Sequence, residues 1–240
     1  METLITVDNL RNFAYLNENA LKLPLRGMIL SFAGCGGMEW FTEDTARGKF
    51  FGERGILYVL PYNNPWNWMN KQAVEYTNEV LDVVHKKYSA LAQLPMAITG
   101  LSMGGCDAMI YSLRGRYKPN TAVLNCPACD LEYQFRKVEL FQRIFYSAFW
   151  HEEGTVEEIF RRQSPICLAD QLPFIDYVFY HSETDEILDK HAHSDAMVAK
   201  LRQLGHKVTY HEFTGCAHAN LPEGGEDQLR QHLLDAFGDK

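Results

Sequence analysis

The sequence predicts an α/β protein in which a mostly parallel, twisted sheet has helices on both faces. Three observations support this fold class. Short apolar runs without polar alternation recur along the chain, as expected of strands covered on both faces. Helical patterns separate these runs, which implies βαβ units with right-handed crossovers. The run from Ile98 to Gly105, I-T-G-L-S-M-G-G, has the pattern of a strand, a sharp turn and a helix.

Each expected element has its own signal, taken here in chain order. The apolar runs that we expect to be strands are 27–33, 55–61, 96–101, 121–126, 175–181 and 207–213. Apolar residues at helical spacing predict helices over 71–90, 104–116, 192–204 and 228–237. Asn70 can cap the first of these helices, and Gly205 and Gly238 follow the last two.

The stretch 131–172 contains no convincing strand. Phe141, Phe145 and Phe149 fall on one helical face, and Thr155 with Glu158 forms a capping-box pattern. We interpret 131–172 as a helical cap inserted into a single domain that spans 1–240. The alternative is that these helices are longer crossover connections.

Charge and composition exclude some classes of protein. The 240 residues have a net charge of −8, which argues against a nucleic-acid groove. The start, Met1 to Leu4, lacks the pattern of a secretory signal, and no apolar run is long enough to span a membrane. We therefore expect a cytoplasmic protein whose six cysteines are reduced. The oligomeric state is left open.

Ser102 is the candidate nucleophile. It lies at the centre of G-x-S-x-G, formed by Gly100, Ser102 and Gly104. A side chain at either glycine would clash with the neighbouring strand or helix. A serine hydroxyl needs a base to take its proton and donors to receive the developing negative charge.

Two later loops supply a base and an acid. His218 follows the strand expected over 207–213 and is the best-placed of the nine histidines to take and return a proton. Asp185 follows the strand over 175–181 and is positioned to orient that imidazole. Asp130 is the main competing carboxylate.

The oxyanion hole requires two backbone N–H groups that point at one place. Met103 follows the nucleophile and should supply one. The loop after the strand over 27–33 should supply the other, from Cys35 or its neighbours Gly34 and Gly36.

These motifs resemble the α/β-hydrolase superfamily, on the small serine esterase side that shades into the prolyl-oligopeptidase-like enzymes. The matching segments are A-G-C-G-G at 33–37, G-L-S-M-G-G at 100–105, H-S-E-T-D at 181–185 and G-C-A-H at 215–218. The resemblance implies an eight-stranded sheet and a triad of Ser102, Asp185 and His218. Two positions depart from the family pattern: Ala33 replaces the histidine of H-G-G-G, and Ser182 replaces the glycine of H-G-x-x-D.

Aromatic residues suggest where a substrate would bind. Trp66, Trp68 and Met69 lie in a loop with two prolines, and Phe149 and Trp150 lie in the expected cap. The alternative is that these side chains fill the junction between cap and sheet. Cys126 and Cys129 form a C-x-x-C pair, for which a redox or metal role is the remote interpretation.

The sequence therefore predicts a serine hydrolase that cleaves a small ester or acyl substrate through an acyl-enzyme on Ser102. No metal or cofactor is required for this chemistry. A peptidase or amidase, a thioesterase or an acyltransferase would use the same triad. A non-catalytic binding module on this fold is the remaining alternative.

Overall fold

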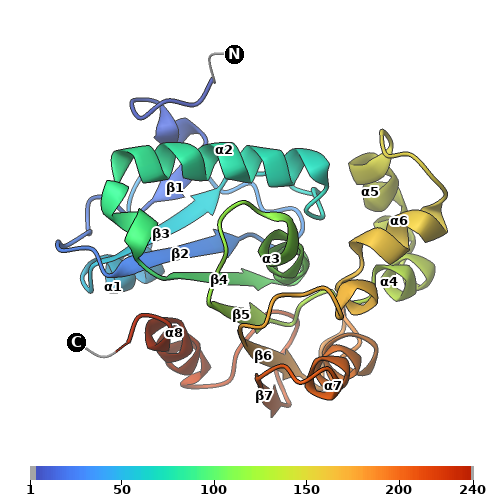
Figure 1. Cartoon of the computed structure of the whole chain (residues 1–240). Helices are drawn as coiled ribbons and strands as arrows, with labels where there is room; N and C mark the ends of the chain where they lie inside the picture. Colours follow the sequence, from blue (N-terminus) through green and yellow to red (C-terminus); the bar gives the residue numbers. More distant parts are fainter. Residues whose placement is uncertain (1–3, 239–240) are drawn as a thin grey trace.

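The computed structural model describes residues 4–238, and its centre is a seven-stranded sheet flanked by helices (Figure 1). The strand order is β1-β3-β2-β4-β5-β6-β7. Their bounds are β1 (Ala14–Leu16), β2 (Gly27–Phe32), β3 (Ile56–Pro61), β4 (Met96–Leu101), β5 (Thr121–Asn125), β6 (Asp176–Ser182) and β7 (Val208–Phe213). Only β1 runs antiparallel to its neighbour among these strands, which confirms a mostly parallel sheet.

The expected number of eight strands was wrong, because the sheet has seven. The difference lies at the N-terminal edge. There the Asn9 side chain accepts a hydrogen bond from the Thr6 amide, at 2.7 Å, and Leu10–Asn12 form a 3₁₀ turn. This local bonding keeps the segment before β1 out of the sheet. Met1 to Thr3, part of the segment without a secretory signal pattern, lie outside the described residues.

The helices alternate with the strands. Their bounds are α1 (Ala46–Gly52), α2 (Lys71–Lys87), α3 (Met103–Arg114), α4 (Leu131–Lys137), α5 (Glu139–Phe149), α6 (Val156–Gln163), α7 (Ala196–Gln203) and α8 (Gly225–Asp235). Shorter helical turns are η1 (Leu10–Asn12), η2 (Ser89–Gln93), η3 (Pro165–Leu168) and the π-turn η4 (His191–Asp195). Asn70 caps α2 as expected, since its side chain accepts a hydrogen bond from the Ala73 amide.

Alternate residues of each strand enter two cores. Met28 and Leu30 of β2 pack with residues of α2, α3 and α7, whereas Ile29 packs on the opposite face with residues of α1 and α8. This two-sided burial explains why the strands read as continuous apolar runs. Figure 1 shows α1 and α8 on the side of the sheet opposite α2.

The stretch 131–172 is helical, and no strand interrupts it. It contains α4, α5, α6 and η3, and we call it the helical segment. The predicted capping box is present, because Thr155 and Glu158 bond each other's backbone amides. Figure 1 shows α4, α5 and α6 grouped to one side of the sheet.

Across residues 4–238, every helix is too short or too polar to pass through a lipid bilayer.

Candidate active site

Ser102 occupies the strained turn between β4 and α3. Its backbone has φ 54° and ψ −121°, a conformation that a non-glycine residue rarely adopts. The turn is held by the Ser102 amide, which donates to the carbonyl of Asn125 at 3.0 Å. A Cβ at Gly100 would overlap the Gly104 carbonyl, and one at Gly104 would overlap the Phe32 carbonyl. Both glycines are therefore required for the turn to form.

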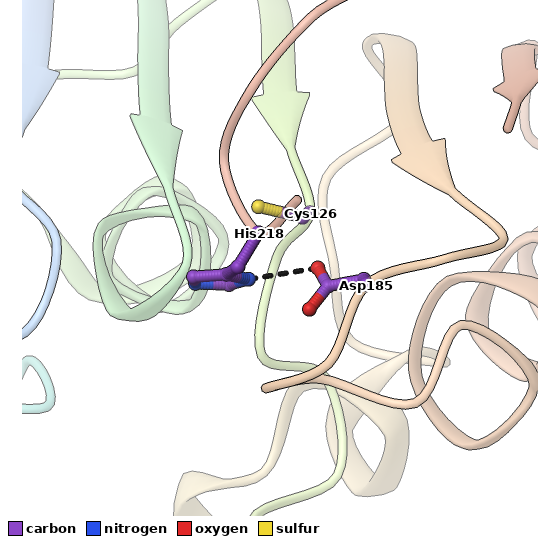
Figure 2. A group of neighbouring side chains, drawn as sticks. All are labelled: Cys126, Asp185 and His218. Atoms are coloured by element: carbon purple, nitrogen blue, oxygen red, sulfur yellow. Dashed lines mark hydrogen bonds and ion pairs between the residues drawn. The ribbon is translucent and has the colours of Figure 1, made fainter. Parts of the chain in front are cut away.

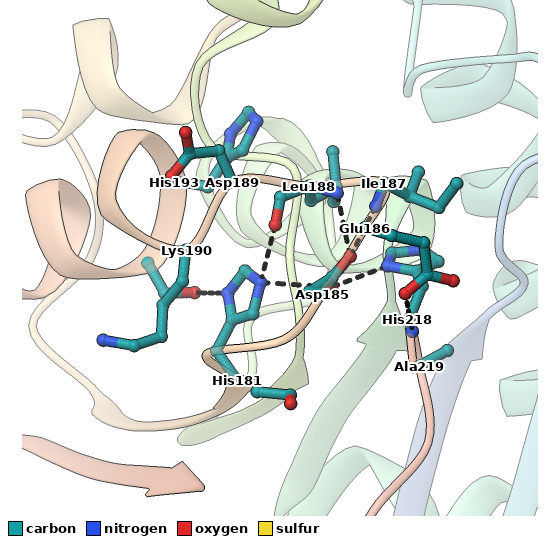
Figure 3. A network of polar contacts seen from close by, with 12 residues as sticks. His181, Asp185, Glu186, Ile187, Leu188, Asp189, Lys190, His193, His218 and Ala219 are labelled. Atoms are coloured by element: carbon teal, nitrogen blue, oxygen red, sulfur yellow. Dashed lines mark hydrogen bonds and ion pairs between the residues drawn. The ribbon is translucent and has the colours of Figure 1, made fainter. Parts of the chain in front are cut away.

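Asp185 and His218 form an ion pair from two different loops (Figure 3). Oδ2 of Asp185 lies 2.7 Å from Nδ1 of His218. The second carboxylate oxygen, Oδ1, accepts hydrogen bonds from the amides of Ile187 and Leu188, each 2.9 Å long. His181, which is buried, brings its Nε2 to 3.2 Å from Oδ2. Four groups thus contact the two carboxylate oxygens.

Electrostatics favour the charged forms of both partners. Burial alone would raise the pKa of Asp185, but hydrogen bonds from His181, His218 and two amides hold its pKa well below the usual range. Burial alone would lower the pKa of His218, but the bond to Asp185 and the nearby Cys126 thiol raise this pKa to about 10. The pair therefore stabilises an imidazolium, which is the form that a general base reaches after taking a proton.

Ser102 and His218 are brought to the same edge of the sheet through Asn125. The Asn125 carbonyl accepts from the Ser102 amide, and its Nδ2 donates to the Ala219 carbonyl at 2.7 Å. No hydrogen bond joins the Ser102 hydroxyl to His218 in the described part of the chain. Because Nδ1 of His218 is paired with Asp185, Nε2 is the ring nitrogen left to face a hydroxyl.

A hydrogen bond within the loop after β2 reduces the number of candidate oxyanion donors. The Gly36 amide donates to the Pro65 carbonyl at 2.8 Å, so this N–H is already engaged. Cys35 and Gly34 remain as the loop's donors opposite Met103, the first residue of α3. Although Cys35 is exposed as a residue, desolvation of its thiol, with a smaller contribution from Asp107, raises the thiol pKa to about 11, so the thiol is protonated at neutral pH.

The five residues expected to bind substrate divide into two groups. Trp66 and Trp150 are exposed and line a cavity of about 1280 Å³ between the helical segment and the start of α2. Trp68, Met69 and Phe149 are buried in the hydrophobic core. For these three, the burial agrees with the alternative that they fill the junction between the helical segment and the sheet.

A second cavity, of about 690 Å³, lies beside the candidate oxyanion donors. Gly34 and Met103 belong to its wall, together with the aromatic residues Tyr15, Trp40, Phe41, Tyr58 and Tyr62. Asp107 of α3 also reaches this wall, and its Oδ1 is buried without a hydrogen-bond partner. Burial raises the pKa of Asp107 well above its usual range, although a bond from Asn67 opposes the shift. Asp107 was not among the predicted site residues, and its only signal in the sequence is a charge among the buried residues of α3.

The structure also places the competing carboxylate and the cysteine pair noted in the sequence. Asp130 caps α4, because its side chain accepts from the Tyr133 amide at 2.9 Å. Cys126 and Cys129 are both free thiols. Cys126 lies beside Asp185 and His218 (Figure 2), and one donor atom from each of the three lies within 4.8 Å of the others. This is the one group of metal-ligand type found within residues 4–238.

Comparison with known proteins identifies the fold. No family model matches the chain, and no curated protein matches it. Solved structures do match. The Pyrococcus horikoshii acylaminoacyl peptidase has a TM-score of 0.69 and 14% identity, over 90% of this chain and 37% of its own. A puromycin-hydrolyzing peptidase of Mycobacterium tuberculosis has a TM-score of 0.69 and 15% identity, over 91% and 35%. Esterase B of Lactobacillus rhamnosis has a TM-score of 0.67 and 11% identity, over 90% and 76%.

These structures share the α/β-hydrolase fold, and the chain described here has that fold. The chain spans little more than a third of the length of the two peptidases.

Proposed function

We propose that the protein is a serine hydrolase that cleaves carboxylic esters through an acyl-enzyme on Ser102. The observation that carries the proposal is the pairing of His218 with a buried carboxylate, at 2.7 Å, on the sheet edge that holds a serine in a strained turn. An imidazole oriented in this way serves as a general base for a nearby hydroxyl.

The reaction follows from these positions. Nε2 of His218 takes the Ser102 proton as Oγ attacks the ester carbonyl carbon. The amides of Met103 and Cys35 donate to the oxyanion of the tetrahedral intermediate. His218 then protonates the leaving alkoxide, and Asp185 stabilises the imidazolium between these steps. A water molecule, deprotonated by the same imidazole, releases the acyl group as a carboxylate.

The acyl group has a place to bind. The 690 Å³ cavity adjoins Gly34 and Met103, so a carbonyl held by the proposed oxyanion donors would extend its acyl chain into aromatic walls. The helical segment, joined to α2 by the Asn70 side chain and the Ala148 carbonyl, would act as the cap over the neighbouring 1280 Å³ cavity.

A peptidase is the second candidate. It is favoured by the printed descriptions of the similar structures, which include an acylaminoacyl peptidase and a puromycin-hydrolyzing peptidase. An amide substrate would require the same attack on a carbonyl, with His218 protonating an amine in place of an alkoxide.

The proposal is tested by labelling with a fluorophosphonate, followed by peptide mass spectrometry. We expect the label on Ser102 and no label in Ser102→Ala. The exposed Ser147 provides the matched control, because Ser147→Ala should label as the wild type does. A folded wild-type protein that stays unlabelled would rule out this nucleophile.

A substrate panel separates the two candidates. Matched p-nitrophenyl esters and p-nitroanilides that carry the same acyl group would be compared by kcat/KM. An esterase should turn over the esters and leave the anilides intact, whereas comparable turnover of aminoacyl anilides would establish the peptidase.

A further inference from the structure

Three donor atoms of different types meet at the proposed catalytic pair, two of them from the pair itself. The thiol of Cys126, the carboxylate of Asp185 and the imidazole of His218 come from three separate loops (Figure 2). Their ligand atoms lie within 4.8 Å of one another. The proposed ester hydrolysis uses the carboxylate and the imidazole but gives the thiol no part. The cluster therefore calls for a separate explanation.

The donor set and its spacing suit zinc. Sulfur, nitrogen and oxygen are the atoms that bind Zn²⁺ in proteins, at about 2.0–2.3 Å in a tetrahedral arrangement. Two ligands of one tetrahedral ion are then separated by roughly 3.3–3.8 Å. The donors lie within 4.8 Å of one another, but Nδ1 of His218 and Oδ2 of Asp185 are only 2.7 Å apart. Side-chain movements of about 1 Å would separate this pair and bring the thiol in, so that all three reach the ligand spacing. A water molecule would complete the coordination.

The surroundings hold these donors in place. The Cys126 amide donates to the Tyr180 carbonyl at 2.7 Å, and Cys126 has a left-handed φ of 38°. Oδ1 of Asp185 is held by two amides, so Oδ2 is the oxygen directed at the cluster. His181 supports Oδ2 from behind, as outer partners of metal ligands do. The His218 side chain is 17% exposed and offers an entry path for an ion.

We propose that Cys126 Sγ, Asp185 Oδ2 and His218 Nδ1 form a reversible Zn²⁺ site whose occupation stops hydrolysis at Ser102. The metal takes the place of the proton between Nδ1 and Oδ2, that proton moves by way of solvent to Nε2, and the thiol proton passes to solvent. A neutral imidazole with Nδ1 on the metal carries its single ring proton on Nε2. That nitrogen then has no lone pair with which to take the serine proton.

Metal binding is tested first, by a measurement that does not depend on activity. Co²⁺ would be titrated as a spectroscopic substitute for Zn²⁺ into wild type, Cys126→Ser and Cys167→Ser. Cys167 is an exposed free thiol and serves as the control for binding at surface cysteines. We expect the near-ultraviolet band of a thiolate–cobalt bond in wild type and Cys167→Ser, and its loss in Cys126→Ser.

The affinity for Zn²⁺ would be measured by competition with a chromophoric chelator. Loss of a direct ligand should weaken binding at least about 100-fold in Cys126→Ser, since changes to outer partners alone weaken metal sites by 10–100-fold. Equal affinity in Cys126→Ser and wild type would overturn the site. Circular dichroism of each variant checks that it is folded.

The inhibitory part of this inference rests on the proposed function, and it has its own measurement. Zn²⁺ should slow fluorophosphonate labelling of wild-type Ser102, and EDTA should restore it. Wild type that binds Zn²⁺ through Cys126 and still labels at the full rate would overturn the inhibition. A protein that never labels, with or without Zn²⁺, would refute the hydrolase proposal instead, and the cobalt titration would still decide the metal site.

Discussion

Asp185 has more partners than orientation of His218 alone requires. Its two oxygens receive two amides, His218 and the buried His181. The sequence order of Ser102, Asp185 and His218 was sufficient to predict the pair, because parallel strands end at one edge. The role of His181 could not be predicted in this way. It depends on the loop after β6 folding back over the end of its own strand, where Thr184 Oγ1 donates to the Cys216 carbonyl at 3.0 Å.

The competing carboxylates give a direct prediction. Asp185→Asn should lower kcat by about 10⁴-fold, because the amide cannot stabilise the imidazolium and favours the wrong ring tautomer. Asp130→Asn should leave kcat within about twofold, since Asp130 caps a helix and asparagine is an equally good cap. Steady-state kinetics on a p-nitrophenyl ester measures both. The reverse ranking would assign the acid to Asp130.

Because Asp107 is buried with a raised pKa, we expect the stability of the protein to depend on pH. Burial raises its folded-state pKa well above the unfolded value, so the folded protein holds a proton that the unfolded chain releases. Its contribution to stability is full below the unfolded pKa, about 3.9. That contribution is lost as pH rises toward the folded pKa. Asp107→Asn removes this loss and should raise the free energy of unfolding by about 1–3 kcal/mol at pH 8.

Urea unfolding at pH 4 and pH 8 tests the sign. The advantage of Asp107→Asn should be present at pH 8 and nearly absent at pH 4. Asp170→Asn, at an exposed aspartate, should track wild type at both values. A constant difference between Asp107→Asn and wild type at the two pH values would contradict a buried, protonated carboxyl.

At the scale of elements, the strands and long helices could be predicted because apolar pattern and burial agree. The run expected over 96–101 is β4, and the run over 121–126 differs from β5 by one residue. The helix α1 was missed. It has seven residues, too few for a periodic pattern, and it depends on a Thr45 cap and on packing of Phe51 against the sheet. Tertiary contacts of this kind leave little signal in a short window.

The capping box at the start of α6 gives a prediction about stability. Thr155→Ala removes the oxygen that accepts from the Glu158 amide and should lower the free energy of unfolding by about 1 kcal/mol. Thr155→Ser keeps that oxygen and should restore most of the loss. Chemical denaturation measures all three proteins. Similar destabilisation by alanine and serine would show that the threonine methyl group, and not the hydroxyl, stabilises the helix start.

The packing of the whole molecule explains why part of the expected substrate site is buried. A tryptophan in a proline-rich loop has the pattern of an exposed binding wall when the loop is considered alone. In the folded chain the helical segment covers it, and the Trp68 ring centroid lies 5.5 Å from that of Phe141 in α5. Contact between segments more than 70 residues apart therefore decides which aromatic residues remain exposed. The local sequence around each residue cannot predict this exposure.

Gln163 joins these distant segments. Its Nε2 donates to the carbonyls of Trp68 and Met69, at 2.5 and 2.8 Å, and its Oε1 accepts from Arg114 of α3 at 2.7 Å. Gln163→Glu keeps the shape and the partner Arg114 but places an oxygen against two buried carbonyls. We expect the change to lower the free energy of unfolding by about 1–3 kcal/mol, because buried acceptors lose their donor.

In Gln163→Glu, we expect the helical segment to lose stability before the sheet does. Hydrogen exchange followed by mass spectrometry should show faster exchange in α5 and α6 of Gln163→Glu, while β4 and β5 keep wild-type protection. Gln171→Glu, at an exposed glutamine, should leave both regions unchanged. If β4 exchanged as fast as α6 in Gln163→Glu, the helical segment would be an inseparable part of the core. Faster exchange in α5 and α6 alone would establish the helical segment as a cap that opens over an intact sheet. The hydrogen bonds from Gln163 to the Trp68 and Met69 carbonyls would then control the opening through which a substrate enters.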